Sequence, residues 1–375
     1  MLNRAIAERI KKAIKGERKV IIIYGPRQSG KTTLIKFLLA EMEAEYEYFT
    51  GDDLYAQNIF GKNELESLKR ILKNDIVVID EAQKIENIGL SLKLIFDNLP
   101  IKIIASGSAS FDLANKLNEP LTGRTKTFWL YPLAYSEIKE KYRKTSPETA
   151  IEEMLRFGMY PKAHTLDSDK EKEGYLYEYL NNYLYKDILA FAGVRKPKKV
   201  VDLLTLLALQ IGKEVAISEL AQNLSLSQKA VENYLDILEK MFVIVNLRGF
   251  SRNLRKEISK TSKYYFVDVG LRNALIRNFN TLGLRSDAGD LFENWFIMEK
   301  IKAADIFEKP ANFYFWRTYD RQEIDLIEER AGNLYGYEVK WKKKTVKQPK
   351  EWLETYKNSS FEAVNKENYL KFIAE

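Results

Sequence analysis

Short apolar runs alternate with segments of helical periodicity over the first 140 residues of the chain. Runs at residues 20–24, 76–79 and 101–105 have the length and the β-branched content of buried strands. After the first run, apolar side chains recur at helical spacing over residues 32–43, and residues 127–131 form a further strand pattern. This alternation predicts an α/β domain.

The alternation ends at a charged segment. Residues 140–149 contain Pro147 and many charged side chains, so we expect the first domain to end near residue 140. The next segment, residues 150–192, is helical and rich in tyrosine, which predicts a packed helical lid rather than a surface for stacking bases. We expect four domains in total, at residues 1–140, 141–198, 199–256 and 257–375.

The third domain is predicted to be a winged helix-turn-helix. Apolar spacing indicates a helix at residues 215–224, a second helix that begins near Ser227, and a strand at residues 242–247. The outward face of the second helix mixes acidic with basic side chains. A basic run follows the strand, formed by Arg248, Arg252, Arg255 and Lys256. Contact with duplex DNA and a purely structural role therefore both stay open.

The composition excludes several kinds of chemistry. The 375 residues are 45% hydrophobic and 30% charged, an ordinary globular balance, and the net charge of +7 permits an anionic partner. The chain has no cysteine, which excludes disulfides, thiolate catalysis and cysteine-bound zinc, and His164 is its single histidine. The charged amphipathic start is unlike a signal peptide, and no segment is suited to cross a bilayer. We expect a cytoplasmic protein with no membrane partner.

A phosphate-binding loop follows the first strand. The sequence GPRQSGKTT at residues 25–33 satisfies the pattern G-x-x-x-x-G-K-[ST] between a strand and a helix. Its N–H groups and the helix N-terminus can bind phosphate oxygens, Lys31 can reach the β- and γ-phosphates, and Thr32 can ligate Mg²⁺. The expected nucleotide-binding residues are Gly25, Pro26, Arg27, Gln28, Ser29, Gly30, Lys31, Thr32 and Thr33.

Two acidic residues end the apolar run at residues 76–79. Asp80 and Glu81 stand at the carboxyl end of this strand, the edge where ligands bind in open α/β sheets. Asp80 would hold Mg²⁺ through water, and Glu81 would orient and deprotonate the attacking water. This Walker B pattern predicts that the bound nucleotide is hydrolysed.

Two further residues are candidates for the same site. Ser108 follows the strand at residues 101–105 and could sense the γ-phosphate, with a plain polar turn as the alternative. Arg124 precedes the strand at residues 127–131, where its guanidinium could neutralise transition-state charge in its own subunit or across a subunit interface. An unpaired surface arginine is the alternative for Arg124.

Five segments resemble a known family when they are taken together. The segments GPRQSGKTT, VIDEAQ, ASGSAS, LTGR and YPLAYSEI, in this order, are similar to prokaryotic AAA+ superfamily ATPases. The resemblance implies a five-stranded parallel sheet, a catalytic glutamate on the Walker B strand, and ATP rather than GTP as the nucleotide. It implies no biological role.

The C-terminal region holds a second group of charged residues. Glu293 lies near the start of a predicted helix, Asp325 lies on a strand, and Glu338 and Lys340 share one face of a further strand. Carboxylates and a lysine in this arrangement suit metal-assisted phosphodiester cleavage, with Glu293, Asp325 and Glu338 as ligands of Mg²⁺ or Mn²⁺. The pattern resembles the PD-(D/E)XK nuclease superfamily, although no proline precedes the aspartate. A solvated charged hairpin is the alternative.

Two functions are consistent with these patterns. In the first, a Mg²⁺-dependent ATPase drives or gates nucleic-acid handling, with DNA favoured over RNA and with cleavage by Glu293, Asp325, Glu338 and Lys340. In the second, the protein is a nucleotide-dependent switch or assembly platform, and its nuclease-like domain binds without cutting. Formation of a homo-oligomer is open in both.

Overall fold

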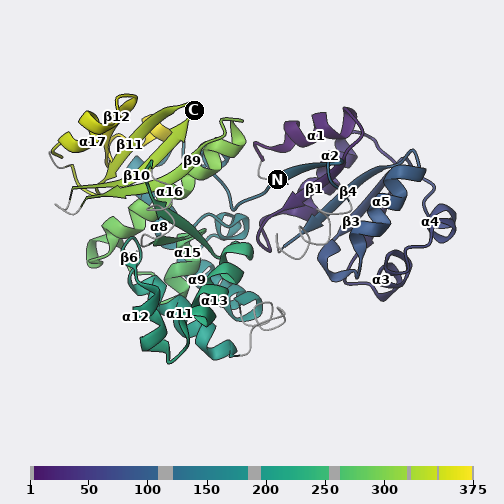
Figure 1. The fold of residues 1–375 in the computed structure, drawn as a ribbon, viewed down its shortest axis with the longest axis horizontal. Coiled ribbons are helices and arrows are strands. Elements are labelled where there is room, and N and C mark those ends of the chain that lie inside the picture. Colours follow the sequence, from purple (N-terminus) through teal and green to yellow (C-terminus); the bar gives the residue numbers. More distant parts are fainter. Residues whose placement is uncertain are drawn as a thin grey trace. The chain divides into compact units, whose positions relative to one another are not determined.

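The computed structural model describes residues 4–108, 121–184, 196–252, 262–318, 322–343 and 346–373. The chain divides into two compact units (Figure 1). The first comprises Met1–Tyr131 with Lys240–Phe242, and the second comprises Pro132–Glu239 with Val243–Glu375. Each unit has its own β-sheet.

The sheet of the first unit is parallel throughout. Its strands are β1 (Val20–Tyr24), β2 (Tyr46–Thr50), β3 (Ile76–Asp80), β4 (Lys102–Gly107) and β5 (Thr125–Trp129). They pair in the order β2-β3-β4-β1-β5, and each neighbouring pair is parallel. Strands β1 and β3 are buried at every residue, as expected for strands covered on both faces. The predicted five-stranded parallel sheet is confirmed.

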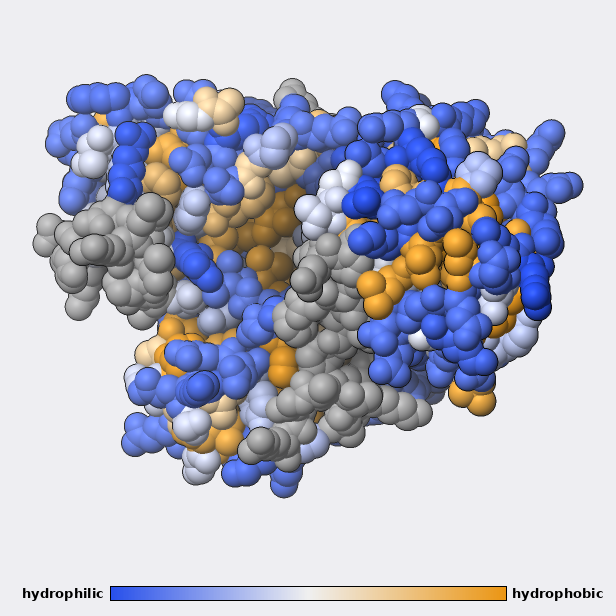
Figure 2. Space-filling view, turned by 45° about the vertical axis from the view of Figure 1, so that its right-hand side comes forward, coloured by the Kyte–Doolittle hydropathy of each residue, from blue (hydrophilic) through white to orange (hydrophobic). Residues whose placement is uncertain are grey.

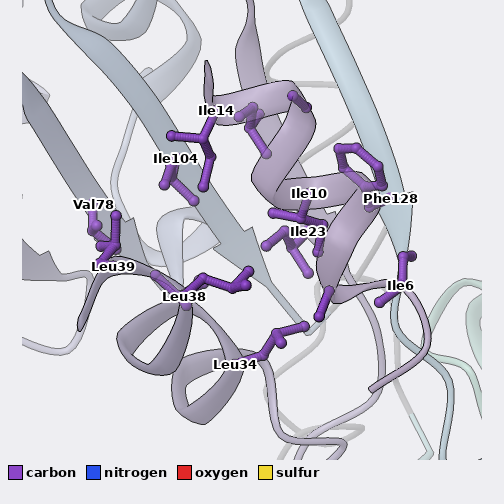
Figure 3. Packing of buried hydrophobic residues seen from close by; sticks show 14 of the residues in the cluster. Ile6, Ile10, Ile14, Ile23, Leu34, Leu38, Leu39, Val78, Ile104 and Phe128 are labelled. Atoms are coloured by element: carbon purple, nitrogen blue, oxygen red, sulfur yellow. The ribbon is translucent and has the colours of Figure 1, made fainter. Parts of the chain in front are cut away.

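Helices pack against this sheet, and the hydrophobic core of the first unit lies between them and the strands. They are α1 (Ala7–Lys15), α2 (Lys31–Glu41), α3 (Leu54–Gly61), α4 (Leu65–Ile71), the short η1 (Ala82–Lys84) and α5 (Ile88–Asn98). The amphipathic α1 buries Ile10 and Ile14 in one cluster with Ile23 and Ile104 of the sheet (Figure 3). Leu34 and the following turns of α2 join the same cluster, which fixes α2 behind the phosphate-binding loop.

The described residues of the second unit form one mixed sheet of seven strands. They are β6 (Glu214–Val215), β7 (Ile244–Gly249), β8 (Ser262–Phe266), β9 (Asn312–Arg317), β10 (Glu323–Arg330), β11 (Asn333–Val339) and β12 (Ser359–Val364). Their order is β12-β11-β10-β9-β7-β8-β6. The parallel pairing of β7 with β9 is short, joining Arg248 to Tyr314 and Gly249 to Phe315.

Strands from both of the domains that we expected after residue 199 belong to this one sheet. Phe250, just beyond β7, packs with Trp316 of β9 and with Trp352 in one buried cluster. Its backbone N–H also donates to the carbonyl of Phe315. Sequence patterns detect single strands, whereas the joining of β7 to β9 depends on contacts distant in sequence. The division into four domains stays a prediction.

Helices and short helical turns complete the second unit. They are α7 (Tyr135–Ile138), α8 (Pro147–Phe157), η2 (Pro161–Thr165), α9 (Asp169–Tyr179), η3 (Leu180–Leu184), α11 (Pro197–Leu209), α12 (Ile217–Leu224), α13 (Gln228–Lys240), α15 (Val269–Leu275), η4 (Leu282–Leu284), α16 (Ala288–Ile306), α17 (Lys350–Thr355) and α18 (Leu370–Ile373). The face in Figure 2 is largely hydrophilic with scattered apolar patches. None of the helices in the described parts of the chain is long and apolar enough to cross a membrane.

Candidate functional site

The phosphate-binding loop joins β1 to α2 and depends on its glycines. A Cβ atom on Gly25 would lie 2.1 Å from the carbonyl oxygen of Leu130, so no side chain fits at this position. Gly30 has a φ of +98°, in the region that favours glycine, and caps the N-terminus of α2. The loop therefore leads directly into the first N–H groups of α2, the arrangement that binds phosphate.

Lys31 lies within this loop and is almost completely buried. Its Nζ donates to the carbonyl oxygens of Gly25 at 2.8 Å and Pro26 at 3.0 Å. Burial lowers the pKa of Lys31 to about 8, against the opposing charges of Glu81 and Asp80. Phosphate oxygens are better partners for the ammonium than these carbonyls, because they carry charge.

Asp80 at the end of β3 accepts hydrogen bonds from three hydroxyls. The Thr32 hydroxyl donates to its Oδ2 at 2.5 Å, the Tyr48 hydroxyl donates to the same oxygen at 2.7 Å, and the Ser106 hydroxyl donates to Oδ1. Burial alone would raise the Asp80 pKa, but the hydrogen bonds from Ser106, Thr32 and Tyr48 hold it below its usual value. Thr32 and Asp80 thus meet as a pair of oxygen ligands suited to Mg²⁺.

Glu81 adopts a left-handed backbone conformation immediately after β3, with a φ of 48°. Its Oε2 accepts a hydrogen bond from Gln83 Nε2 at 2.6 Å and one from Ser108 Oγ at 3.3 Å. Gln83 also donates to Ser108 Oγ at 3.0 Å. The structure therefore brings the predicted residues Glu81 and Ser108 together, through a glutamine that the motif analysis did not single out.

Arg124 lies near the amino ends of the strands, opposite the end of the sheet where the phosphate-binding loop lies. Its backbone carbonyl accepts a hydrogen bond from the N–H of Val20, the first residue of β1, whereas the phosphate-binding loop follows the last. A five-residue strand spans about 16 Å, which separates Arg124 from the loop. The Arg124 guanidinium instead pairs with Asp97 at 3.0 Å. Within its own chain Arg124 does not join the nucleotide site, and a role across a subunit interface stays a prediction.

A second candidate site is a polar cavity of about 390 Å³ in the second unit. Helix α16 contributes Glu293, strand β10 contributes Asp325, and the chain just after β11 contributes Lys340. Three of the four charged residues predicted for this region therefore line one cavity. The remaining lining residues are Gly212, Lys213, Glu214, Lys263, Gly289, Asp290, Arg317, Glu323, Val339 and Trp341.

Glu293 is positioned by the neighbouring residue on α16. The Asn294 side chain accepts from the N–H of Phe266 and donates to its carbonyl, both at 2.7 Å, which docks α16 against β8. Glu293 Oε1 then accepts a hydrogen bond from the Tyr265 hydroxyl at 2.6 Å. Burial and the charge of Asp325 raise the pKa of Glu293 to about 8.

Asp325, Glu338 and Lys340 form a connected group. Asp325 Oδ2 accepts from the N–H of Val339 at 2.8 Å and from Lys340 Nζ at 3.3 Å. Lys340 Nζ also lies 2.7 Å from Glu338 Oε1. Burial and the charge of Asp325 raise the pKa of Glu338 to about 7.

Lys263 on β8 is a buried cation that the sequence analysis missed. Its side chain is 2% exposed, and its Nζ lies 2.6 Å from Glu323 Oε1 and 4.0 Å from Asp325 Oδ1. Burial would lower the Lys263 pKa, but the charges of Glu293, Asp325 and Glu323 raise it above its usual value. No local motif marks Lys263, because its partners lie far along the chain.

The carboxylates of this cavity do not fit the divalent metal that the nuclease resemblance implies. Over the described ranges, no three or more His, Cys, Asp or Glu side chains come together as a group that could hold a metal ion. Ammonium groups of Lys263 and Lys340 flank Asp325 instead. This arrangement of charges does not support metal-assisted cleavage at the cavity.

A family comparison matches an AAA domain to most of the first unit and to the start of the second. The AAA domain family matches residues 17–139. Two families described as domains of unknown function match residues 148–282 and 288–369. The second unit thus matches families whose descriptions name no activity.

Relatives and a solved structure share most of the chain. The uncharacterized protein Rv2008c of Mycobacterium tuberculosis is 28% identical over 343 residues, 90% of this chain and 74% of that protein. The uncharacterized protein MJ1544 of Methanocaldococcus jannaschii is 26% identical over 330 residues, 82% of this chain and 72% of that protein. The Walker-type ATPase PABY2304 of Pyrococcus abyssi matches with a TM-score of 0.52 at 19% identity, over 74% of this chain and 96% of that one.

These similarities agree with the geometry of the first unit. At 19% identity, the match to the Pyrococcus structure shows a shared fold. The AAA domain match covers residues 17–139, the part of the chain that contains the phosphate-binding loop, and it supports an ATP-binding domain of the AAA type there.

Proposed function

We propose that the first unit hydrolyses ATP with Mg²⁺. The observation that carries this proposal is the meeting of Thr32 with Asp80 beside Glu81, at the end of the sheet where the phosphate-binding loop lies. A phosphate loop alone is sufficient to bind a nucleotide, whereas hydrolysis also needs a metal-holding acid and a group that activates water. All three lie at one edge of this sheet.

Each residue has a defined part in this proposal. Lys31 and the N–H groups of the loop bind and orient the phosphates. Thr32 and Asp80 would hold Mg²⁺, which would neutralise charge on the phosphates. Glu81 orients the attacking water and accepts its proton, while Gln83 and Ser108 fix the carboxylate that performs this step.

Phosphate release from ATP tests this function directly. We expect the purified chain to release phosphate in the presence of Mg²⁺, and we expect EDTA to stop the reaction because Thr32 and Asp80 cannot hold ATP productively without the metal. Fluorescent-ATP binding with and without Mg²⁺ is the companion measurement. Continued turnover at the same rate in EDTA would rule out a metal-dependent mechanism, and binding without any turnover would reduce the first unit to a nucleotide sensor.

We further propose that the second unit binds nucleic acid, with duplex DNA as the favoured form. The order α11, β6, α12, α13, β7, β8, with β6 and β7 on either side of β8, supports a winged helix. Arg248 and Arg252 are exposed at the end of β7, where a wing would begin. The predicted partners Arg255 and Lys256 lie outside the described residues.

Binding without cleavage is the better supported version of this proposal. Exposed side chains of α13 include Lys229, Glu232 and Asp236, a face with more acid than base. Contact of Arg248 and Arg252 with the phosphate backbone of DNA therefore suits the module better than reading of base edges by α13. The nuclease-like arrangement of β10 and β11 would then serve binding, since its carboxylates do not form a metal group in the described residues.

Salt-dependent DNA binding tests this second proposal. We expect duplex DNA to bind at low salt and to dissociate as salt rises. Contacts with phosphates release counterions from the DNA, and this release becomes less favourable at higher salt concentration. Arg248→Glu with Arg252→Glu is expected to weaken binding at least tenfold, while the exposed Lys309→Glu serves as the matched control. Fluorescence anisotropy with DNA and RNA duplexes measures both. Equal affinities of the double variant and the control, or Mg²⁺-dependent cutting of the DNA, would contradict the proposal.

A further inference from the structure

We propose that Arg4 is a positioning residue of the nucleotide site, whose guanidinium holds the peptide group between Ser29 and Gly30 so that the Gly30 N–H faces the bound phosphates. The proposal deepens the proposed function of the first unit and rests on it, since it concerns how the phosphate-binding loop is kept ready for ATP. It gives a part in nucleotide binding to a residue that lies outside the phosphate-binding motif.

The Arg4 guanidinium joins the phosphate-binding loop to the segment that follows β5. Its Nη1 donates to the carbonyl oxygen of Ser29 at 2.6 Å, and its Nη2 donates to the carbonyl oxygen of Tyr131 at 2.7 Å. Arg4 is 8% exposed and Ser29 is completely buried, so water has little access to the contact between them. The planar guanidinium presents several N–H donors in a fixed fork, which suits the binding of two carbonyl oxygens at once.

The segment after β5 gives this contact a firm support. The N–H of Leu130 donates to the carbonyl oxygen of Tyr24, the last residue of β1, at 2.7 Å. The carbonyl group of Leu130 in turn packs so closely against Gly25 that no side chain fits there. Tyr131 is the next residue and is therefore held at the base of the loop. Through Tyr131, Arg4 ties the loop to the sheet.

Helix α1 determines where Arg4 lies. The carbonyl oxygen of Arg4 accepts a hydrogen bond at 3.0 Å from the N–H of Ala7, the first residue of α1. Ile6 and Ile10 are buried in the same hydrophobic cluster as Leu34 of α2 (Figure 3). The packing of a helix that precedes β1 thus brings Arg4 to the loop that follows β1.

The contact with Ser29 sets the direction of the next N–H group. In a trans peptide the C=O and N–H bonds point in opposite directions, so a Ser29 carbonyl held by Arg4 directs the Gly30 N–H to the other side. Gly30 does not fix this direction itself, because glycine adopts positive and negative φ about equally well, and its φ here is +98°. Rotation of this peptide group would present a carbonyl oxygen to the phosphates in place of an N–H. The contact with Arg4 opposes that rotation.

ADP binding by the full-length chain tests the proposal without requiring hydrolysis. We expect Arg4→Met to weaken ADP binding by about tenfold or more, because methionine keeps an apolar stem and removes both donors. Inorganic tripolyphosphate that competes with fluorescent ADP should lose affinity by the same factor, since the Gly30 N–H meets phosphate rather than the base. In steady-state ATP hydrolysis, KM should rise by a similar factor while kcat stays within about threefold, the result of losing a contact made equally before and during the reaction.

A second arginine of the first unit offers a matched control. The guanidinium of Arg18 also donates to backbone carbonyls, those of Phe96 and Leu99, but Arg18 precedes β1 at the amino ends of the strands. Arg18→Met should keep the wild-type affinities for ADP and tripolyphosphate. Arg4→Lys is the second test variant, because lysine keeps the charge but lacks the planar fork, and it should weaken ADP binding at least threefold. Folding of each variant is checked by circular dichroism.

Three outcomes would overturn the proposal. Equal ADP affinities of folded Arg4→Met and Arg18→Met, or a wild-type affinity in Arg4→Lys, would show that the two-carbonyl contact does not position the loop. Weaker ADP binding with unchanged tripolyphosphate binding would show that Arg4 acts on the nucleoside. A fall in kcat with unchanged KM would indicate a purely structural role. A wild-type chain that binds ADP without hydrolysing ATP would contradict the proposed function instead, and the comparison of ADP affinities would still decide the role of Arg4.

Discussion

Replacement of Glu81 by glutamine is expected to leave ATP bound while lowering kcat by about 10²–10⁴-fold, the usual contribution of a general base. The amide has nearly the shape of the carboxylate, so the polar contacts with Gln83 and Ser108 can largely persist. It cannot accept a proton from water at neutral pH, however. The phosphate contacts of Lys31 and Thr32 are made by other side chains, and ATP affinity should therefore change little.

Single-turnover phosphate release and fluorescent-ATP binding separate these two effects. Glu86→Gln is the matched control, since Glu86 is an exposed acid of the same segment and has no place in the site. The control should keep the wild-type rate. Normal turnover by Glu81→Gln would remove Glu81 from its proposed role, and a parallel loss of ATP binding would show that Glu81 organises the pocket rather than the chemistry.

ATP affinity is expected to fall steeply with rising pH, by about tenfold per pH unit above pH 8, because of Lys31. Burial lowers the pKa of Lys31 to about 8 in the free protein. The phosphates of bound ATP favour the charged ammonium, so the pKa of Lys31 is higher in the complex. Above pH 8, binding must therefore take up a proton, and affinity declines until the pH reaches the pKa of the complex.

The Lys31→Arg variant separates this effect from general alkaline damage. A guanidinium stays charged throughout this range, so the variant should show a nearly flat profile between pH 7 and 10 even if its affinity is lower at pH 7. The measurement is the Kd for ATP by fluorescence, on protein shown by circular dichroism to stay folded. A flat wild-type profile, or an equal decline in the arginine variant, would contradict the assignment to Lys31.

Much of the nucleotide site could be predicted because its signals are local. Gly25, Gly30, Lys31 and Thr32 lie in one stretch of the chain, between a strand and a helix that apolar spacing reveals. Asp80 and Glu81 end a second apolar run, and parallel pairing brings that end to the same edge of the sheet. The sequence therefore indicated both the candidate residues and the edge of the sheet where they meet.

Other contacts of the site could not be predicted from local patterns. Tyr48 reaches Asp80 because β2 pairs with β3 in a register that sets Tyr48 opposite Val78, and a sequence pattern does not fix that register. Gln83 meets Glu81 because the backbone turns into a left-handed conformation at residue 81. The position of Arg124 could not be predicted either: it lies just before β5, beside the first residue of β1, and pairs with Asp97, so only its role across a subunit interface stays a prediction.

The sequence by itself determined the fold class of the first unit and the residue types of both sites. Each is encoded in short segments, where apolar periodicity and motif spacing can be recognised without knowledge of distant contacts. Only the tertiary structure decided how the charges of the second unit are balanced. Lys263 meets Glu323 because β8 and β10 belong to one seven-stranded sheet, a pairing set by side-chain packing between distant segments. Electrostatic energy depends on distances in space, and those distances follow from the packing of the whole unit.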